Sequence, residues 1–350
     1  MKFENKKWVL RVALAGALSL GVATVAKADS TAAAAPTFSV IAQELATQSF
    51  GTYSGTGTQT TPNSRTGDAL SFNLQHVILG SVYSIDAIDN LTVSSELVGG
   101  FALLNAYDTH SLSDIYNGLA LKVGQFQIPF GYNAYQTPDQ LIRINYNTID
   151  TLTSPAGTVV DAAQQFDLGA ELDQNWSDLS LQLAVVQNNG AINSTGNKDW
   201  AARAQWKSQN VLLGLSDYYQ ASSVGVVNNT NFFGANASVL VDIFRLDLEA
   251  ILGNQGNGVS GNGYSAILSA KTNGFQPAVW YEFTNSNASN IPAAYNNMNT
   301  PDLGIGLNFD LAAKTRLAID ADFTGYNANN NGGGDLLAVN TERVQLQEVF

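Results

Sequence analysis

The sequence predicts an all-β protein, a transmembrane antiparallel β-barrel of about 16 strands, with 14 strands as the other possible count. Apolar and polar residues alternate with a period of two along most of the chain after residue 36. Some of these segments are joined by two to four residues and others by 15 or more. A barrel that crosses a membrane needs short turns at one end and long loops at the other. A soluble β-sandwich or a β-helix would also alternate, but the loops are very uneven and no repeat of about 20 to 50 residues is present.

The composition excludes several other classes. Charged residues make up 13% of the 350 residues, about half the 25% that is usual for soluble domains. Hydrophobic residues make up 45%, which argues against a disordered chain, because such chains are poor in hydrophobic residues. A helical membrane protein would need several runs of about 20 apolar residues, and only one such run exists. The absence of Cys excludes disulfide scaffolds and thiolate zinc sites. With only His76 and His110 besides, we expect no metal and no cofactor.

The N-terminus has the pattern of a secretory signal peptide over residues 1–28. A basic stretch precedes an apolar region at 12–25, and Ala26-Lys27-Ala28 has the form of a cleavage site. An uncleaved membrane anchor is the alternative. Cleavage after Ala28 removes five of the 16 basic and one of the 29 acidic residues, so 11 and 28 remain and the net charge becomes -17. Such a chain should not bind nucleic acid, because phosphates are neutralised by Lys and Arg.

A short segment, 29–36, then leads into the barrel, 37–350. Its expected strands, in chain order, are 37–49, 69–83, 91–107, 117–128, 164–173, 176–187, 198–208, 210–220, 231–242, 244–253, 262–271, 275–284, 302–311, 315–324 and 340–350. These are 15, whereas bacterial single-chain barrels have an even number. One strand is therefore missed or false, and 142–150 is the best candidate for a missed one. Sixteen strands would enclose an interior wide enough for an aqueous channel.

The polar face of each strand is expected to face the interior, because a basic group at the bilayer midplane costs about 2–4 kcal/mol. The predicted pore-lining residues are Lys122, Arg203, Lys207, Arg245, Arg316, Asp167, Glu171, Asp247, Glu249, Glu282, Asp310, Asp320 and Asp322. Eight acids against five bases predict a weak preference for cations. Alternatively, these charges only solvate the wall and pair with one another.

On the two strands 302–311 and 315–324 the alternation is strict. Ile305, Leu307, Ile319 and Phe323 are expected to face lipid, and Asn308, Asp320 and Asp322 to face water.

One long connection, 132–164, is the candidate for a constriction loop that folds into the channel. It carries Asp139, Arg143, Asp150 and Asp161. The alternative is an external surface loop.

A specific resemblance lies just before this loop. Residues 121–131 resemble the GQFxxPFG signature of the phosphate-selective porin family (porins O and P), and 166–172 and 183–190 are similar to the segments C-terminal to that signature in the family. The resemblance covers about 116 to 190 and implies a 16-stranded trimeric porin. Phosphate selectivity in that family relies on many inward Arg and Lys, of which this chain has few. The fold and the passive channel are therefore expected, and the phosphate specificity is not.

The C-terminal Phe350 ends an alternating segment, which resembles the signal that the barrel assembly machinery reads in Gram-negative outer membranes. Glu348 departs from that signal, since its position is normally apolar.

Together these features predict a homotrimeric channel in the outer-membrane lipid of a Gram-negative bacterium, for small ions and hydrophilic solutes. Two alternatives are a sleeve or scaffold for a partner protein and a barrel enzyme. For the enzyme, His110 lies near Asp108 in an expected loop, without a nucleophile pattern.

Overall fold

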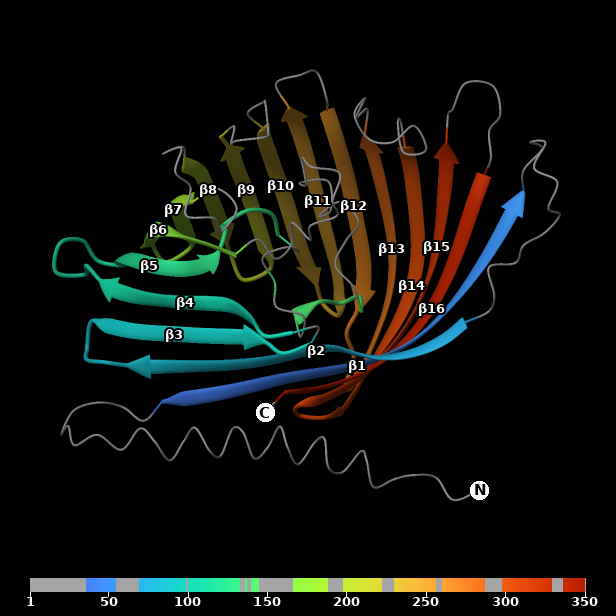
Figure 1. The fold of residues 1–350 in the computed structure, drawn as a ribbon, viewed down its shortest axis with the longest axis horizontal. Coiled ribbons are helices and arrows are strands. Elements are labelled where there is room, and N and C mark those ends of the chain that lie inside the picture. The colour runs from blue at the N-terminus through green and yellow to red at the C-terminus, as the bar shows by residue number, and fades with distance from the viewer. Residues whose placement is uncertain are drawn as a thin grey trace.

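The computed structural model describes residues 36–54, 69–98, 100–132, 136, 140–144, 166–187, 198–221, 230–255, 260–286, 298–328 and 336–349. They form a closed barrel of 16 antiparallel strands, in which each strand pairs with its neighbours in sequence and β1 pairs with β16 (Figure 1). The predicted fold class and the count of 16 are confirmed.

The bounds of the strands are β1 Thr37–Ser54, β2 Ala69–Ser84, β3 Asp89–Glu96, β4 Ala102–Ser111, β5 Leu119–Gln127, β6 Phe166–Asn175, β7 Leu179–Gln187, β8 Lys198–Lys207, β9 Val211–Gln220, β10 Thr230–Val241, β11 Phe244–Gln255, β12 Ser260–Ala270, β13 Phe275–Ser286, β14 Met298–Ala312, β15 Thr315–Ala328 and β16 Leu336–Val349.

Because successive strands are antiparallel, their connections fall alternately at the two ends of the barrel. We call one the short-turn end; its connections are residues 85–88, 112–118, 176–178, 208–210, 242–243, 271–274 and 313–314. The opposite end is the long-loop end. Two of these turns have only two residues, 242–243 and 313–314. In the first of them Asp242 has a φ of 56°, a positive value of the kind found in type I′ and II′ hairpin turns.

The sixteenth strand is not where the sequence suggested. The expected strand 91–107 is two strands, β3 and β4, which turn back at residues 97–101. The Gly-Gly pair at 99–100 is the signal for this turn, and Gly100 has a φ of 134°. Residues 142–144 form bends rather than a strand, and 145–150 lie outside the described residues. Apolar alternation alone does not separate two strands when the turn between them is short and itself apolar.

The two faces of the sheet follow the predicted alternation. Ile305 and Phe323 are 54% and 46% exposed, whereas Asn308, Asp320 and Asp322 are buried. An apolar outer band of this kind suits a lipid environment. No helix among the described residues has the length and apolar character to span a membrane.

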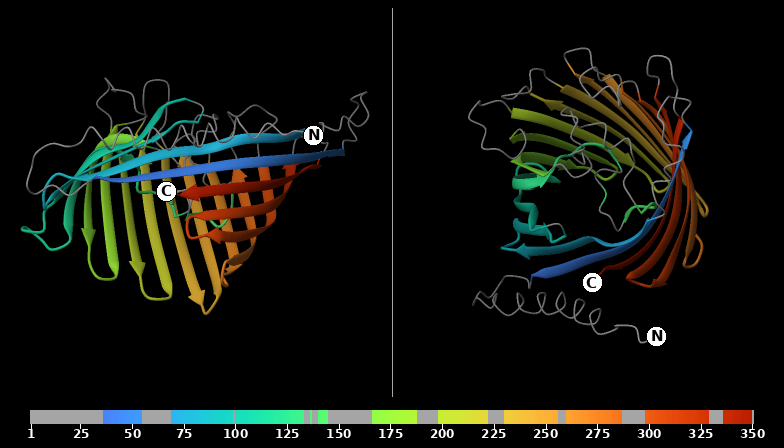
Figure 2. Two further views of the ribbon diagram at one scale, coloured as in Figure 1. Left: turned by 90° about the horizontal axis from the view of Figure 1, so that it is seen from below. Right: turned by 45° about the vertical axis from the view of Figure 1, so that its right-hand side comes forward.

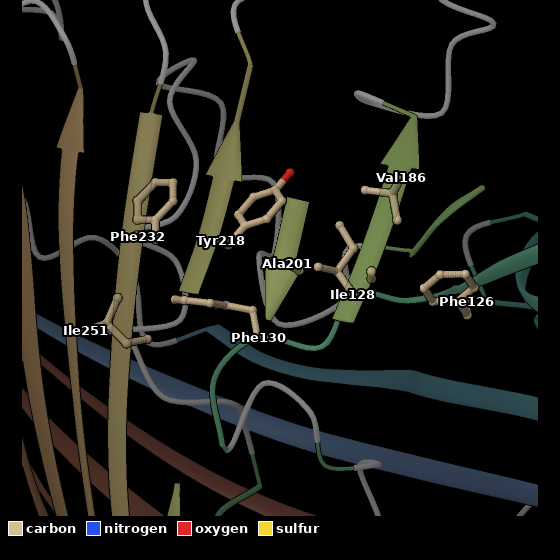
Figure 3. Close-up of a cluster of buried hydrophobic side chains, with 9 residues drawn as sticks. Phe126, Ile128, Phe130, Val186, Ala201, Tyr218, Phe232 and Ile251 are labelled. Carbon is tan, nitrogen blue, oxygen red and sulfur yellow. The ribbon is translucent and has the colours of Figure 1, made fainter. Parts of the chain in front are cut away.

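Part of the interior face is apolar, contrary to the expectation of a uniformly polar wall. Nine buried side chains form this cluster: Phe126, Ile128, Phe130, Ala184, Val186, Ala201, Tyr218, Phe232 and Ile251 (Figure 3). They come from strands β5 to β11 and from the residues just after β5. The cluster can be apolar because those residues fold inward and cover it.

Candidate channel interior and its internal segment

The chain turns into the barrel directly after β5. Pro129 cannot donate a ladder hydrogen bond, and Gly131 has a φ of 72°, which favours glycine. Phe130 and Tyr132 are buried. The right-hand view of Figure 2 shows this green segment inside the ring of strands. We call the described residues 128–132 and 140–144 the internal segment. Its first half thus begins within the GQFxxPFG-like signature.

The first half of the internal segment is held by apolar packing. The Phe130 ring lies 6.2 Å from that of Tyr218 and 6.3 Å from that of Phe232, between ring centroids (Figure 3). A Cβ at Gly234 would lie 2.4 Å from Ser216 Oγ and 3.6 Å from the Phe130 ring. Glycine at this wall position therefore leaves room for the Ser216 hydroxyl, whereas the Phe130 ring would only be in ordinary van der Waals contact with the added atom.

Three polar contacts fix the same half. Gly131 N donates to Ser216 Oγ at 3.1 Å, and Tyr132 N donates to Glu249 Oε1 at 2.6 Å. The Tyr132 hydroxyl accepts from Arg245 Nη2 at 2.6 Å. Burial, together with a nearby carboxylate, raises the pKa of Tyr132, so the hydroxyl is neutral and able to accept this bond.

The second half of the internal segment is held by charge. Arg143 is 4% exposed in its side chain and forms an ion pair with Glu282. Its Nη2 lies 3.3 Å from Asp302 Oδ2 and 3.5 Å from Asp322 Oδ1. Its guanidinium carbon also lies 4.7 Å from the centroid of the Trp280 ring, a cation–π contact that a desolvated site strengthens.

Trp280 completes the binding site for Arg143. Its Nε1 donates to Asp322 Oδ1 at 2.9 Å. The indole lies against two glycines of β14: a Cβ at Gly304 would lie 2.1 Å from the ring, and one at Gly306 would lie 2.9 Å from it. Strand β14 therefore has glycine where a larger residue would displace the tryptophan.

Further contacts hold the backbone of the second half. Asn308 Nδ2 donates to Ile142 O at 2.8 Å, and Arg316 Nη1 donates to Leu141 O at 2.9 Å. Ile144 N donates to Asp320 Oδ2 at 3.2 Å. Arg343 pairs with the other oxygen of Asp320, at 2.8 Å from its Nε, and also with Asp322.

These contacts correct one expectation. Asn308, Asp320 and Asp322 were expected to face water. They lie on the interior face, but the internal segment and Arg343 cover them, so they are 4–6% exposed. The reason is tertiary: their partners are 21 to 179 residues away in sequence.

The remaining predicted pore-lining residues occupy different surroundings. Lys122 pairs with Glu171 and lies 3.6 Å from Asp173, with the Tyr107 and Phe126 rings 5.1 and 5.5 Å away. Arg203 Nη1 donates to Gln182 Oε1 at 3.2 Å, and Asp167 is buried. Lys207 is exposed, whereas Asp310 lies next to a short turn, where its carboxylate is 3.6 Å from Lys271 Nζ.

Of the predicted constriction-loop residues, Arg143 lies inside the barrel. Asp139, Asp150 and Asp161 lie outside the described residues, as does the assembly residue Phe350. Tyr132, Trp280 and Arg343 were not among the predicted site residues. Arg343 was on the polar face of the last strand, and Trp280 shares the face of Glu282, so alternation could have placed both of them inside. An aromatic residue on that face was not expected to take part in the site.

Each of the two histidines pairs with a carboxylate. His76 Nδ1 lies 2.9 Å from Glu96 Oε2, and His110 pairs with Asp89. His110 is in strand β4, not in a loop as expected. The described residues contain no group of three or more His, Asp or Glu side chains arranged to hold a metal ion.

No family model and no curated protein matches the sequence. Solved structures match the fold. An anion-selective porin from Comamonas acidovorans has a TM-score of 0.68 and 12% identity, covering 91% of this chain and 100% of that chain. The outer membrane channel DcaP of Acinetobacter baumannii has a TM-score of 0.68 and 11% identity, and the match covers 92% of this chain and 99% of that chain.

The trimer form of OmpT, an outer membrane protein of Vibrio cholerae, has a TM-score of 0.60 and 9% identity, covering 91% and 100%. The chain thus has a 16-stranded barrel of the porin type. At these identities the likeness shows the fold, and the chemistry of the interior depends on this chain's own side chains.

Proposed function

We propose that the protein is an outer-membrane porin, a water-filled channel for the passive diffusion of small hydrophilic solutes and ions. The observation that carries the proposal is a closed barrel with an apolar outer face, a largely polar inner face and a chain segment folded between its walls. Barrels of 16 to 18 strands enclose a channel, and a segment inside such a barrel narrows it.

The proposal includes an export route and an assembly. Residues 1–28 are removed as a signal peptide, the barrel assembly machinery recognises the C-terminal strand with Phe350, and the mature chain forms a homotrimer in a Gram-negative outer membrane. Support comes from the sequence pattern and from solved structures of similar fold that are described as porins, an outer-membrane channel and a trimer.

The proposed channel prefers cations weakly. The mature chain carries 28 acidic and 11 basic residues, and charges along a pore bias which ions enter. The Comamonas porin of similar fold is described as anion-selective, but at 12% identity the wall charges do not carry over. The resemblance to the phosphate-selective porins supports the barrel and the passive channel, and the proposal does not extend to phosphate.

Planar-bilayer recordings of the purified, detergent-folded protein test this function. Folded protein should insert as stable conducting steps, and a salt gradient should give a small reversal potential of the sign for cations. Heat-denatured protein at the same concentration is the control. If the folded protein gives no steps above that control, the channel proposal is wrong. If it gives steps with an anion reversal potential, only the cation preference fails.

A further inference from the structure

Charged side chains on the interior face are sorted by height along the barrel axis. In the described part of β5 to β16, five bases lie within four residues of the short-turn end of their strands: Lys122, Arg203, Lys207, Arg245 and Arg316. Four interior acids lie in the same zone, namely Glu171, Asp173, Asp247 and Asp310. We call this zone the lower zone; it is close to neutral, with one more base than acid.

Five to ten residues from the short-turn end of the strands, acidic side chains outnumber basic ones on the interior face. Seven interior acids lie there: Asp167, Asp199, Glu249, Glu282, Asp302, Asp320 and Asp322. Among the described residues, the bases at this level are Arg343 from β16 and Arg143 from the internal segment. This upper zone has a net formal charge of -5.

The two zones are far enough apart to act separately. A strand rises about 3.3 Å per residue and is tilted by about 35–45° in a membrane barrel, so about five residues correspond to roughly 12 Å along the axis. This equals or exceeds the Debye length of about 10 Å at 0.1 M salt. All seven acids of the upper zone are at most 6% exposed, so they act on a permeating ion through their electric field and not by contact. An ion that moves along the axis therefore passes the field of one zone before that of the other.

We propose that this charge step makes the channel rectify, which rests on the proposed porin function. Cations cross the acidic upper zone more easily than anions do, whereas the lower zone lacks this bias. When the long-loop side is positive, cations driven through the upper zone and anions driven through the lower zone both accumulate where the zones meet. The opposite polarity depletes that region. Conductance is thus higher with the long-loop side positive.

The test uses single-channel currents at both polarities in symmetric KCl. At 0.1 M salt the larger current should exceed the smaller about two-fold, and the ratio should approach one near 1 M, where the Debye length is about 3 Å. Lys207 is exposed at the short-turn end of β8. Lys207→Glu changes the formal charge of the lower zone from +1 to -1 and reduces the charge step, so it should lower the 0.1 M ratio and strengthen the cation preference.

Lys198→Glu is the matched control, because Lys198 lies at the other end of β8 and nine residues away, on the opposite face. It should leave the ratio unchanged. The chain has no Cys, so Lys207→Cys can identify the sides: a positively charged thiol reagent should act faster from the short-turn side and restore the ratio. Symmetric wild-type currents at 0.1 M, an unaltered ratio in Lys207→Glu, or the opposite polarity would each overturn the inference while leaving a conducting porin. Absence of any conductance would instead refute the proposed function.

Discussion

The two halves of the internal segment are held to the barrel wall in opposite ways. Residues 128–132 pack into the apolar cluster on β9 to β11 through Phe130, whereas residues 140–144 are fixed by Arg143 among carboxylates of β13 to β15. Apolar packing stabilises in proportion to buried area and tolerates side chains of similar volume. Buried charge pairs contribute little net stability when intact, but losing one partner is costly. The apolar packing of Phe130 thus supplies most of the stabilisation that holds the internal segment to the wall. The ion pairs of Arg143 fix the segment in one position along the wall.

Arg143→Ala should have the largest effect. It leaves Glu282, Asp302 and Asp322 buried with one guanidinium fewer, which costs about 3–5 kcal/mol. We expect the second half of the segment to leave the wall and the conductance to rise. In a chain without native Cys, Asn308→Cys should then react faster with a water-soluble thiol reagent, because its cover at Ile142 is lost. Unchanged labelling in the Arg143→Ala background would contradict the attachment.

Phe130→Ala should have the next largest effect, about 3 kcal/mol, from lost burial and a residual cavity between Tyr218 and Phe232. Urea unfolding of the detergent-folded barrel measures it. Phe130→Leu is the control and should cost about half as much, because it keeps an apolar group in the site. Equal losses for the two variants would mean that the aromatic ring itself, rather than the buried area, holds this half.

Gly304→Ala tests the wall of the charged attachment. The new Cβ would overlap the Trp280 indole, so that ring must move away from Arg143, at a cost of about 1–3 kcal/mol. Tryptophan fluorescence should change together with an increase in conductance. A fluorescence spectrum like that of the wild type would show that Trp280 can adapt.

Tyr132→Phe should have the smallest effect, about 1 kcal/mol, because it removes one hydrogen bond from Arg245 and leaves the ring in place. Since the pKa of Tyr132 is raised by burial, its hydroxyl is protonated in the folded barrel at and somewhat above its usual pKa. In the unfolded chain the Tyr132 hydroxyl ionises at its usual pKa, whereas in the folded barrel it stays protonated. The free energy of unfolding therefore falls as the pH rises through that usual pKa. The wild type should therefore lose stability above about pH 10, and Tyr132→Phe should lose less of it in urea titrations over that range.

The sequence by itself determined the barrel. Period-two alternation set which side chains face outward on β13 to β15, and the spacing of the segments gave 16 strands even though β3 and β4 were read as one. This works because the facing of a strand residue depends only on its neighbours along the chain. The signature at 121–131 marked where the chain leaves the wall, since proline and glycine act locally.

Only the tertiary structure decided which interior charges meet water. Asp320 and Asp322 have the same local pattern as an open pore wall, yet Arg343, 21 and 23 residues further on, and the internal segment, about 180 residues earlier, cover them. Trp280 and the apolar cluster lie on the inward face, where polar side chains were expected, and the internal segment packs against both of them. Residues that are far apart in the sequence come into contact across the lumen only when the sheet closes into a barrel. The local alternation of the sequence does not specify which of them meet.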